Sequence, residues 1–204
     1  MIVTSFKNLP LSLVLSGFLF AASALGGGAA NAADKEGNLA IKGMGLAKCS
    51  TFVASLDARD DRIDAYFGWA SGYLTAVNQY ETGLYDIVDW QSDGYIAISL
   101  KNWCSANADE PFFAAVYAMT KSLKPDAVTA ESPLVEIAGA SNSMRLYRST
   151  LDRIRARLAE LGFHTPSVQG EDDLETALTR FQAARGLPAT GVPDDPTLFM
   201  LFKK

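Results

Sequence analysis

The sequence predicts an all-α protein in which a signal peptide precedes two small helical domains. Three features support this prediction. The N-terminus is apolar and ends in small residues, apolar residues repeat at helical spacing through much of the remaining chain, and a segment with prolines and small polar residues separates two parts of different charge. We expect a signal peptide over residues 1–32, a first domain over 40–125, a linker over 126–143 and a second domain over 144–204.

The composition excludes several classes of function. The chain has 204 residues with a net charge of -5, which argues against nucleic acid as a partner because phosphate binding needs a basic face. One histidine and two cysteines are too few for a four-ligand zinc site, and the chain has no P-loop, GxGxxG or CxxCH motif. We therefore expect no metal and no cofactor.

The first 32 residues have the pattern of a secretory signal. Lys7 is the only charged residue before Asp34, residues 9–25 are almost wholly apolar, and the triplet Ala30-Asn31-Ala32 follows. We expect cleavage after Ala32, with Ala24 as a second candidate, and a mature protein in the periplasm without membrane contact. The alternative is an uncleaved anchor, for which the apolar run is short, since a span needs about 20 residues.

Charge and composition separate the two expected domains. Residues 33–136 hold 8 basic and 15 acidic residues, whereas residues 137–204 hold 9 basic and 8 acidic ones. Between them lie Pro125, Pro133 and the small polar run 139–143, which are typical of a linker.

Helical stripes of apolar residues run through the first domain. They predict helices that start near Cys49, after Asp60 or Asp61, after Ser92 or Asp93, and at Pro111, with the last ending before Pro125. The members of the stripes are Cys49, Phe52, Val53 and Leu56; Ile63, Tyr66, Phe67, Ala70, Tyr73, Leu74, Val77 and Tyr80; Ile96, Leu100, Trp103 and Cys104; and Phe112, Phe113, Val116 and Met119.

Cys49 and Cys104 are the two cysteines of a chain that is expected to be secreted. In an oxidising compartment they favour a disulfide, which would close a loop of 56 residues. The chain-entropy model gives such a loop about 4 kcal/mol of stabilisation. The alternatives are two buried free thiols or a redox-active thiol, although neither residue lies in a CxxC motif.

The first domain resembles small two-cysteine helical proteins of the periplasm. The residues that carry the resemblance are Cys49–Phe52, Trp69–Leu74 and Trp103–Asn107. They are similar to HdeA-type acid-stress chaperones and to Rap/Tai-type immunity proteins. The first resemblance implies exposure of aromatic surface when acid protonates the carboxylates, and the second implies a toxin as partner. The alternative is a structural helical domain of no transferable function.

The second domain shows three further helical stretches. One carries Leu146, Leu151, Ile154, Leu158 and Leu161 and ends at Gly162, where glycine permits a left-handed stop. The next follows a cap at Asp172 or Asp173. The last begins at Asp195 as its cap, with proline in the first turn.

These stretches resemble the three-helix peptidoglycan-binding domain found on bacterial wall hydrolases and amidases. The matching pieces are Leu158–Phe163, Gly170, Thr176, Phe181-Gln182, Gly186–Gly191 with Leu187, and Pro196–Leu198 with Thr197. The sequence departs from the family in its first loop, where Gln169 replaces the usual aspartate and Asp172–Glu175 replaces a glycine and a proline. The resemblance implies peptidoglycan as the partner.

Gly170, Thr176, Phe181, Gln182, Leu187, Gly191 and Thr197 are expected to serve the fold. The polar residues expected to face the ligand are His164, Gln169, Arg180 and Arg185, because an arginine fork donates two hydrogen bonds to a stem-peptide carboxylate. The alternative for each is a solvated surface side chain.

Five arginines, Arg145, Arg148, Arg153, Arg155 and Arg157, lie on the polar face of one expected helix. We expect them to be solvated or to meet anionic wall polymers or the acidic first domain.

No catalytic set is visible, since His164 has no neighbouring nucleophile in the sequence. We therefore expect a non-catalytic periplasmic envelope protein that binds peptidoglycan, and other envelope proteins as further partners. An enzyme is the competing class.

Overall fold

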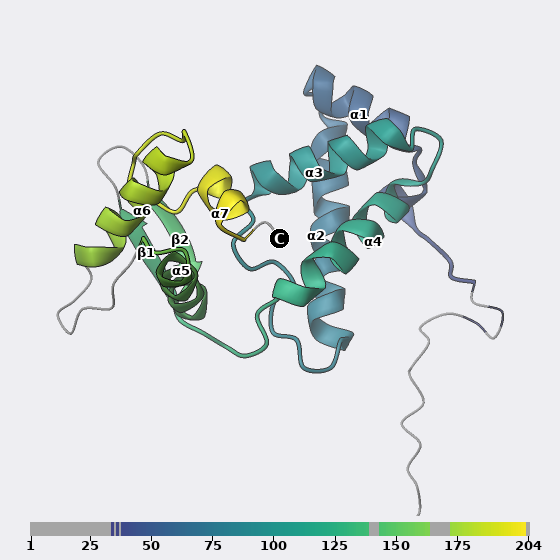
Figure 1. The fold of residues 1–204 in the computed structure, drawn as a ribbon. Coiled ribbons are helices and arrows are strands. Elements are labelled where there is room, and N and C mark those ends of the chain that lie inside the picture. Colours follow the sequence, from purple (N-terminus) through teal and green to yellow (C-terminus); the bar gives the residue numbers. More distant parts are fainter. Residues whose placement is uncertain (1–33, 35, 37, 139–142, 164–171, 203–204) are drawn as a thin grey trace, which may run out of the picture. The chain divides into compact units, whose positions relative to one another are not determined.

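A computed structural model describes residues 34, 36, 38–138, 143–163 and 172–202 (Figure 1). The expected signal peptide and its two cleavage sites lie outside these residues. The chain divides into residues 1–39 and 40–204, and every element below belongs to the second unit. The described residues are mostly helical, so the predicted fold class is confirmed. No helix among them combines the length and the apolar character that crossing a bilayer requires.

Four helices form where the first set of apolar stripes predicts them. Asp61 is the N-cap residue of the second helix and makes no side-chain cap bond, while the preceding Asp60 accepts the Arg62 N–H on its Oδ1 at 3.0 Å. Ser92 caps the third helix by accepting the Tyr95 N–H at 3.2 Å. Pro111 directly precedes the fourth helix. The elements are η1 (Gly43–Leu46), α1 (Cys49–Ala58), α2 (Arg62–Tyr80), α3 (Asp93–Ala106), α4 (Phe112–Leu123) and η2 (Lys124–Asp126).

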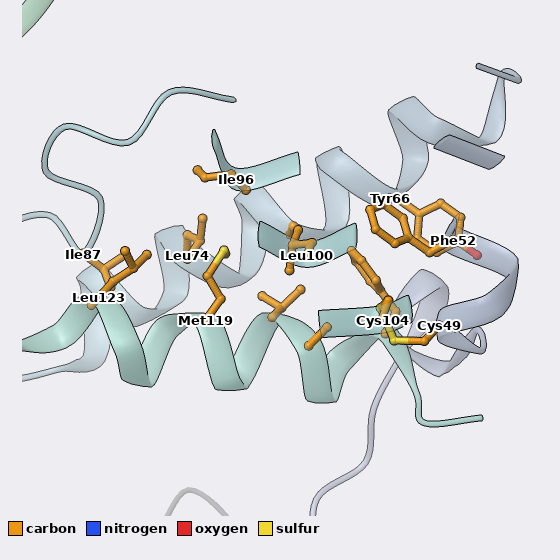
Figure 2. Close-up of a cluster of buried hydrophobic side chains, with 14 residues drawn as sticks. Cys49, Phe52, Tyr66, Leu74, Ile87, Ile96, Leu100, Cys104, Met119 and Leu123 are labelled. Carbon is orange, nitrogen blue, oxygen red and sulfur yellow. A yellow bond between two sulfur atoms is a disulfide. The ribbon is translucent and has the colours of Figure 1, made fainter. Parts of the chain in front are cut away.

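The core of these helices is aromatic at the end near the cysteines. Phe52, Tyr66 and Phe112 are fully buried, and their ring centroids lie 4.7–5.2 Å apart. Figure 2 shows Cys49 and Cys104 joined beside them, with an S–S distance of 2.05 Å. The predicted disulfide is therefore confirmed, and it links α1 to α3.

A second core is built by α5 (Arg148–Glu160), α6 (Asp172–Ala184) and α7 (Asp195–Phe202), the helices expected of the three-helix domain. Its buried residues are mostly aliphatic: Leu151, Ile154, Leu158, Leu174, Leu178, Leu198 and Leu201, together with Phe181.

The N-terminus of α7 corrects one detail of the sequence analysis. Asp194, not Asp195, caps this helix, because Asp194 Oδ1 accepts the Thr197 N–H at 3.0 Å. Asp195 is the first helical residue and accepts the Ser92 N–H at 3.1 Å. Either carboxylate fits the local sequence, so spacing alone did not separate them.

A hairpin lies partly within the expected linker. β1 (Leu134–Ala138) pairs antiparallel with β2 (Ser143–Tyr147). Val135 and Ile137 are half-buried against the second core, while Leu134, Glu136 and Ala138 are exposed. This period-two alternation is that of a strand, and the neighbouring prolines and small residues obscured it. The division of the chain into two domains stays a prediction.

The loop between α2 and α3 contacts the second core. Trp90 is buried among its residues, and the buried Asp89 carboxylate accepts hydrogen bonds from the Thr150 hydroxyl and from Arg153 Nη1. Burial raises the pKa of Asp89, while Thr150 and Arg153 act in the opposite direction by favouring the charged form. Arg153 also donates to the Asp126 carbonyl at 2.9 Å.

Candidate functional site

A buried glutamine organises the loop between α6 and α7. Gln182 is fully buried, and its Nε2 donates to the Val192 carbonyl at 2.8 Å and to Thr197 Oγ1 at 2.9 Å. Its Oε1 accepts the Gly191 N–H at 2.9 Å. One side chain therefore ties the loop to the start of α7 and satisfies polar groups that are shielded from water.

Gly191 brings the same loop against α6. Its φ of +71° lies in the left-handed region, and a Cβ placed there would come within 2.5 Å of Glu175 Cγ. A side chain at this position would push the loop away from α6. Gln182 and Gly191 thus hold this part of the loop in place, and Gly191 itself lines a cleft beside α6.

A cleft of 300 Å³ opens between the hairpin, α5 and α6. Leu151 and Leu174 are buried residues in its lining, whereas Arg148 and Glu175 are exposed. The full lining is Val135, Glu136, Ile137, Ala138, Arg148, Leu151, Arg155, Leu174, Glu175 and Gly191. An apolar base with charged groups around it suits a small amphipathic ligand.

The two arginines of the cleft differ in their partners. Arg155 forms an ion pair with Asp152 at 3.2 Å within α5. The Arg148 guanidinium has no hydrogen bond or ion pair with any other described residue, and the Arg148 backbone N–H donates to the Pro133 carbonyl. Arg148 is therefore available to bind an anion through two parallel hydrogen bonds.

The binding residues expected from the sequence are placed elsewhere or are not described. His164, Gln169 and the fold residue Gly170 lie outside the described residues. Arg180 is exposed on α6, and the exposed Arg185 places its guanidinium 5.4 Å from the centroid of the Phe181 ring. Neither arginine is among the residues that line the cleft. Their roles in binding stay predictions.

The other expected fold residues occupy varied environments. Phe181 and Thr197 are buried, Leu187 is half-buried and Thr176 is exposed. Phe181 packs edge-on against Phe163 at a centroid distance of 5.4 Å.

The sequence predicts Arg148 and Arg155 on one helix with three other arginines, solvated or facing anionic wall polymers or the first domain. The helix is shorter than expected, because Arg145 and Leu146 lie on β2 and α5 begins at Arg148. The sequence does indicate that Arg148, Leu151 and Arg155 lie together. Leu151 and Arg155 follow Arg148 by three and seven residues, so all three share one helical face. The missing information was the hairpin, which forms the opposite wall of the cleft.

Another cavity, of 360 Å³, lies among α3, α4 and α7. Its walls include Trp90, Tyr95, Trp103, Phe199 and Phe202. It is mainly apolar and carries no arginine, so it offers no charged group for an anionic ligand. Across the part of the chain that the structure describes, no group of three or more His, Cys, Asp or Glu side chains is arranged to hold a metal ion.

Residues 148–201 match the family model described as "putative peptidoglycan binding domain". The match spans α5, α6 and α7 and excludes both the hairpin and the first four helices. No curated protein and no solved structure gives a significant match. The comparisons therefore support the resemblance of the C-terminal helices to a peptidoglycan-binding domain, and they leave the resemblances of the first domain as predictions.

Proposed function

We propose that the protein is a non-catalytic component of the periplasm that binds peptidoglycan through residues 144–204 and thereby anchors its disulfide-linked first domain at the cell wall. The observation that carries this proposal is the family match over residues 148–201. The cleft between β1, α5 and α6 supports it with an arginine that is free to bind an anion.

Sedimentation with purified sacculi tests the binding. The mature chain from Ala33 is mixed with insoluble peptidoglycan at moderate ionic strength, and cellulose serves as the control polysaccharide. We expect depletion of the protein by sacculi and not by cellulose. Equal behaviour with both materials contradicts the proposal. The intact mature chain is used because Trp90, from the first domain, is buried in the second core.

The matched family is described as a binding domain, and this description supports a role without catalysis. Prolonged incubation with sacculi should release no soluble fragments and no new reducing or amino ends. Release above that of a heat-denatured sample would show an enzyme.

The periplasmic location rests on the sequence of residues 1–32. We expect the protein to be recovered in the periplasmic fraction with an N-terminus at Ala33, or at Leu25 if the signal is cut after Ala24. A full-length chain retained in the cytoplasm contradicts this part of the proposal.

A further inference from the structure

The cleft runs along a strand edge that has no partner strand among the described residues. The described sheet consists of β1 and β2 alone, so the edge of β1 away from β2 is unpaired within it. Four consecutive residues of β1, Val135–Ala138, line the cleft. Unpaired strand edges present backbone donors and acceptors that an additional extended chain can bind.

The register of the hairpin shows which backbone groups point toward this edge. The Arg148 N–H donates to the Pro133 carbonyl at 2.9 Å, which extends the ladder by one bonded pair. Bonded and non-bonded pairs alternate in an antiparallel ladder. Val135 and Ile137 therefore bond to β2, and the N–H and C=O groups of Glu136 and Ala138 point away from it.

The spacing of these groups matches a short peptide. Residues two apart on a strand repeat at about 7 Å, and the four lining residues span about 10 Å. That length suits an extended peptide of three or four residues. Peptidoglycan contains glycan strands and short stem peptides, and the stem peptide is the part that carries both peptide amides and free carboxylates.

Charge points to the same occupant. Arg148, whose side chain has no partner among the described residues, and Arg155 lie on the α5 side of the cleft. A carboxylate of a peptide laid along β1 would face them, and hydrogen bonds to ionised groups are about twice as strong as neutral ones. A neutral sugar chain would leave this guanidinium without an anionic partner.

We propose that the stem peptide of peptidoglycan binds as an added strand on the outer edge of β1, with its backbone on Glu136 and Ala138 and a carboxylate on Arg148. This proposal rests on the proposed function and specifies the component recognised. The hairpin, which lies outside the family match, then forms part of the binding site.

The first test compares three materials with the intact mature chain. These are whole sacculi, glycan strands stripped of stem peptides by an amidase, and whole sacculi with free stem tetrapeptide as competitor. We expect binding to whole sacculi, loss of binding to stripped glycan and displacement by the tetrapeptide. Equal binding to whole and stripped material overturns the strand-addition proposal and leaves the proposed function intact. No binding to whole sacculi overturns both.

The second test uses charge variants of exposed arginines. Arg148→Glu should weaken the affinity for whole sacculi about tenfold or more, because it places a carboxylate against the carboxylate of the ligand. Arg59→Glu, at an exposed arginine that follows α1 and lies outside the cleft, is the matched control with the same charge change, and it should alter affinity less than twofold. Equal losses in the two variants overturn the proposed contact.

The third test removes a backbone donor. Glu136→Pro deletes an N–H that points to the free edge and spares the bonds to β2, and proline is tolerated on edge strands in that orientation. We expect reduced binding with an unchanged unfolding transition. A correctly folded variant with undiminished affinity overturns the strand-addition geometry. If this variant does not fold, the comparison of Arg148→Glu with Arg59→Glu decides whether the cleft binds the ligand.

Discussion

The two hydrophobic cores of the protein are held together in different ways. The first packs the rings of Phe52, Tyr66 and Phe112 beside the disulfide of Cys49 and Cys104. The second is mainly aliphatic, contains no disulfide and buries the amide of Gln182 among loop groups. The first core thus contains a covalent link, whereas the second contains a hydrogen-bonded loop that borders the candidate cleft.

Removal of the disulfide should cause the largest loss of stability. Replacing Cys49 and Cys104 by alanine should lower the free energy of unfolding by about 4 kcal/mol, because the unfolded chain regains the entropy of a long loop. Urea unfolding of the wild type with and without reductant is the companion measurement. A loss below about 1 kcal/mol would show that the aromatic packing alone holds the first domain.

Removal of the buried Gln182 amide should cause the next largest loss of stability. Gln182→Met should cost about 3 kcal/mol, because it leaves the Val192 carbonyl, the Thr197 hydroxyl and the Gly191 N–H without their partner. Arg180→Ala, two residues away on α6 and exposed, should change stability by less than about 0.5 kcal/mol. Similar unfolding midpoints for the two variants would contradict a structural role for the buried amide.

Two glycines beside Gln182 should differ in how much an alanine substitution destabilises the protein. Gly186 and Gly191 have φ values of +68° and +71°, so alanine is strained at both. Only at Gly191 would the new Cβ meet a neighbour, Glu175 Cγ. We expect Gly186→Ala to cost about 1 kcal/mol and Gly191→Ala about 2 kcal/mol. Chemical denaturation of both variants measures the difference, and equal losses would mean that the contact with α6 relaxes freely.

The smallest expected effect is the dependence of folding stability on pH that arises from Asp89. Burial raises the pKa of this carboxyl, so the folded state retains a proton that the unfolded state releases near pH 3.8. This contribution to stability is fully present below pH 3.8 and is lost as pH rises through the folded pKa.

Arg153→Met removes the positive partner of Asp89 and should raise the folded pKa further, because the charged form loses its ion pair. The decline in stability from pH 4 to pH 7 should grow by about 1 kcal/mol. Adding Asp89→Asn should abolish that extra slope, and the comparison is made by unfolding at a series of pH values. An unchanged slope in Arg153→Met would show that Asp89 is solvated.

Helical spacing predicted most of the fold, since the stripes through Cys49, Tyr66, Ile96 and Phe112 lie on α1 to α4. The disulfide followed from two cysteines in a chain expected to be secreted. The hairpin was not predicted, because its alternating residues are few and lie next to Pro133 and a run of small residues. For the same reason the sequence did not distinguish Arg148 from the other arginines of its group, since the cleft wall opposite Arg148 is β1.

The most direct test of the binding site follows each backbone amide by nuclear magnetic resonance while soluble peptidoglycan fragments are added to the intact mature chain. Fragments with stem peptides should shift the amides of residues 134–138, 148–155 and 174–175, and should leave those of α1 and α2 unchanged. Shifts confined to α1–α4, or none at saturating fragment, would contradict the account.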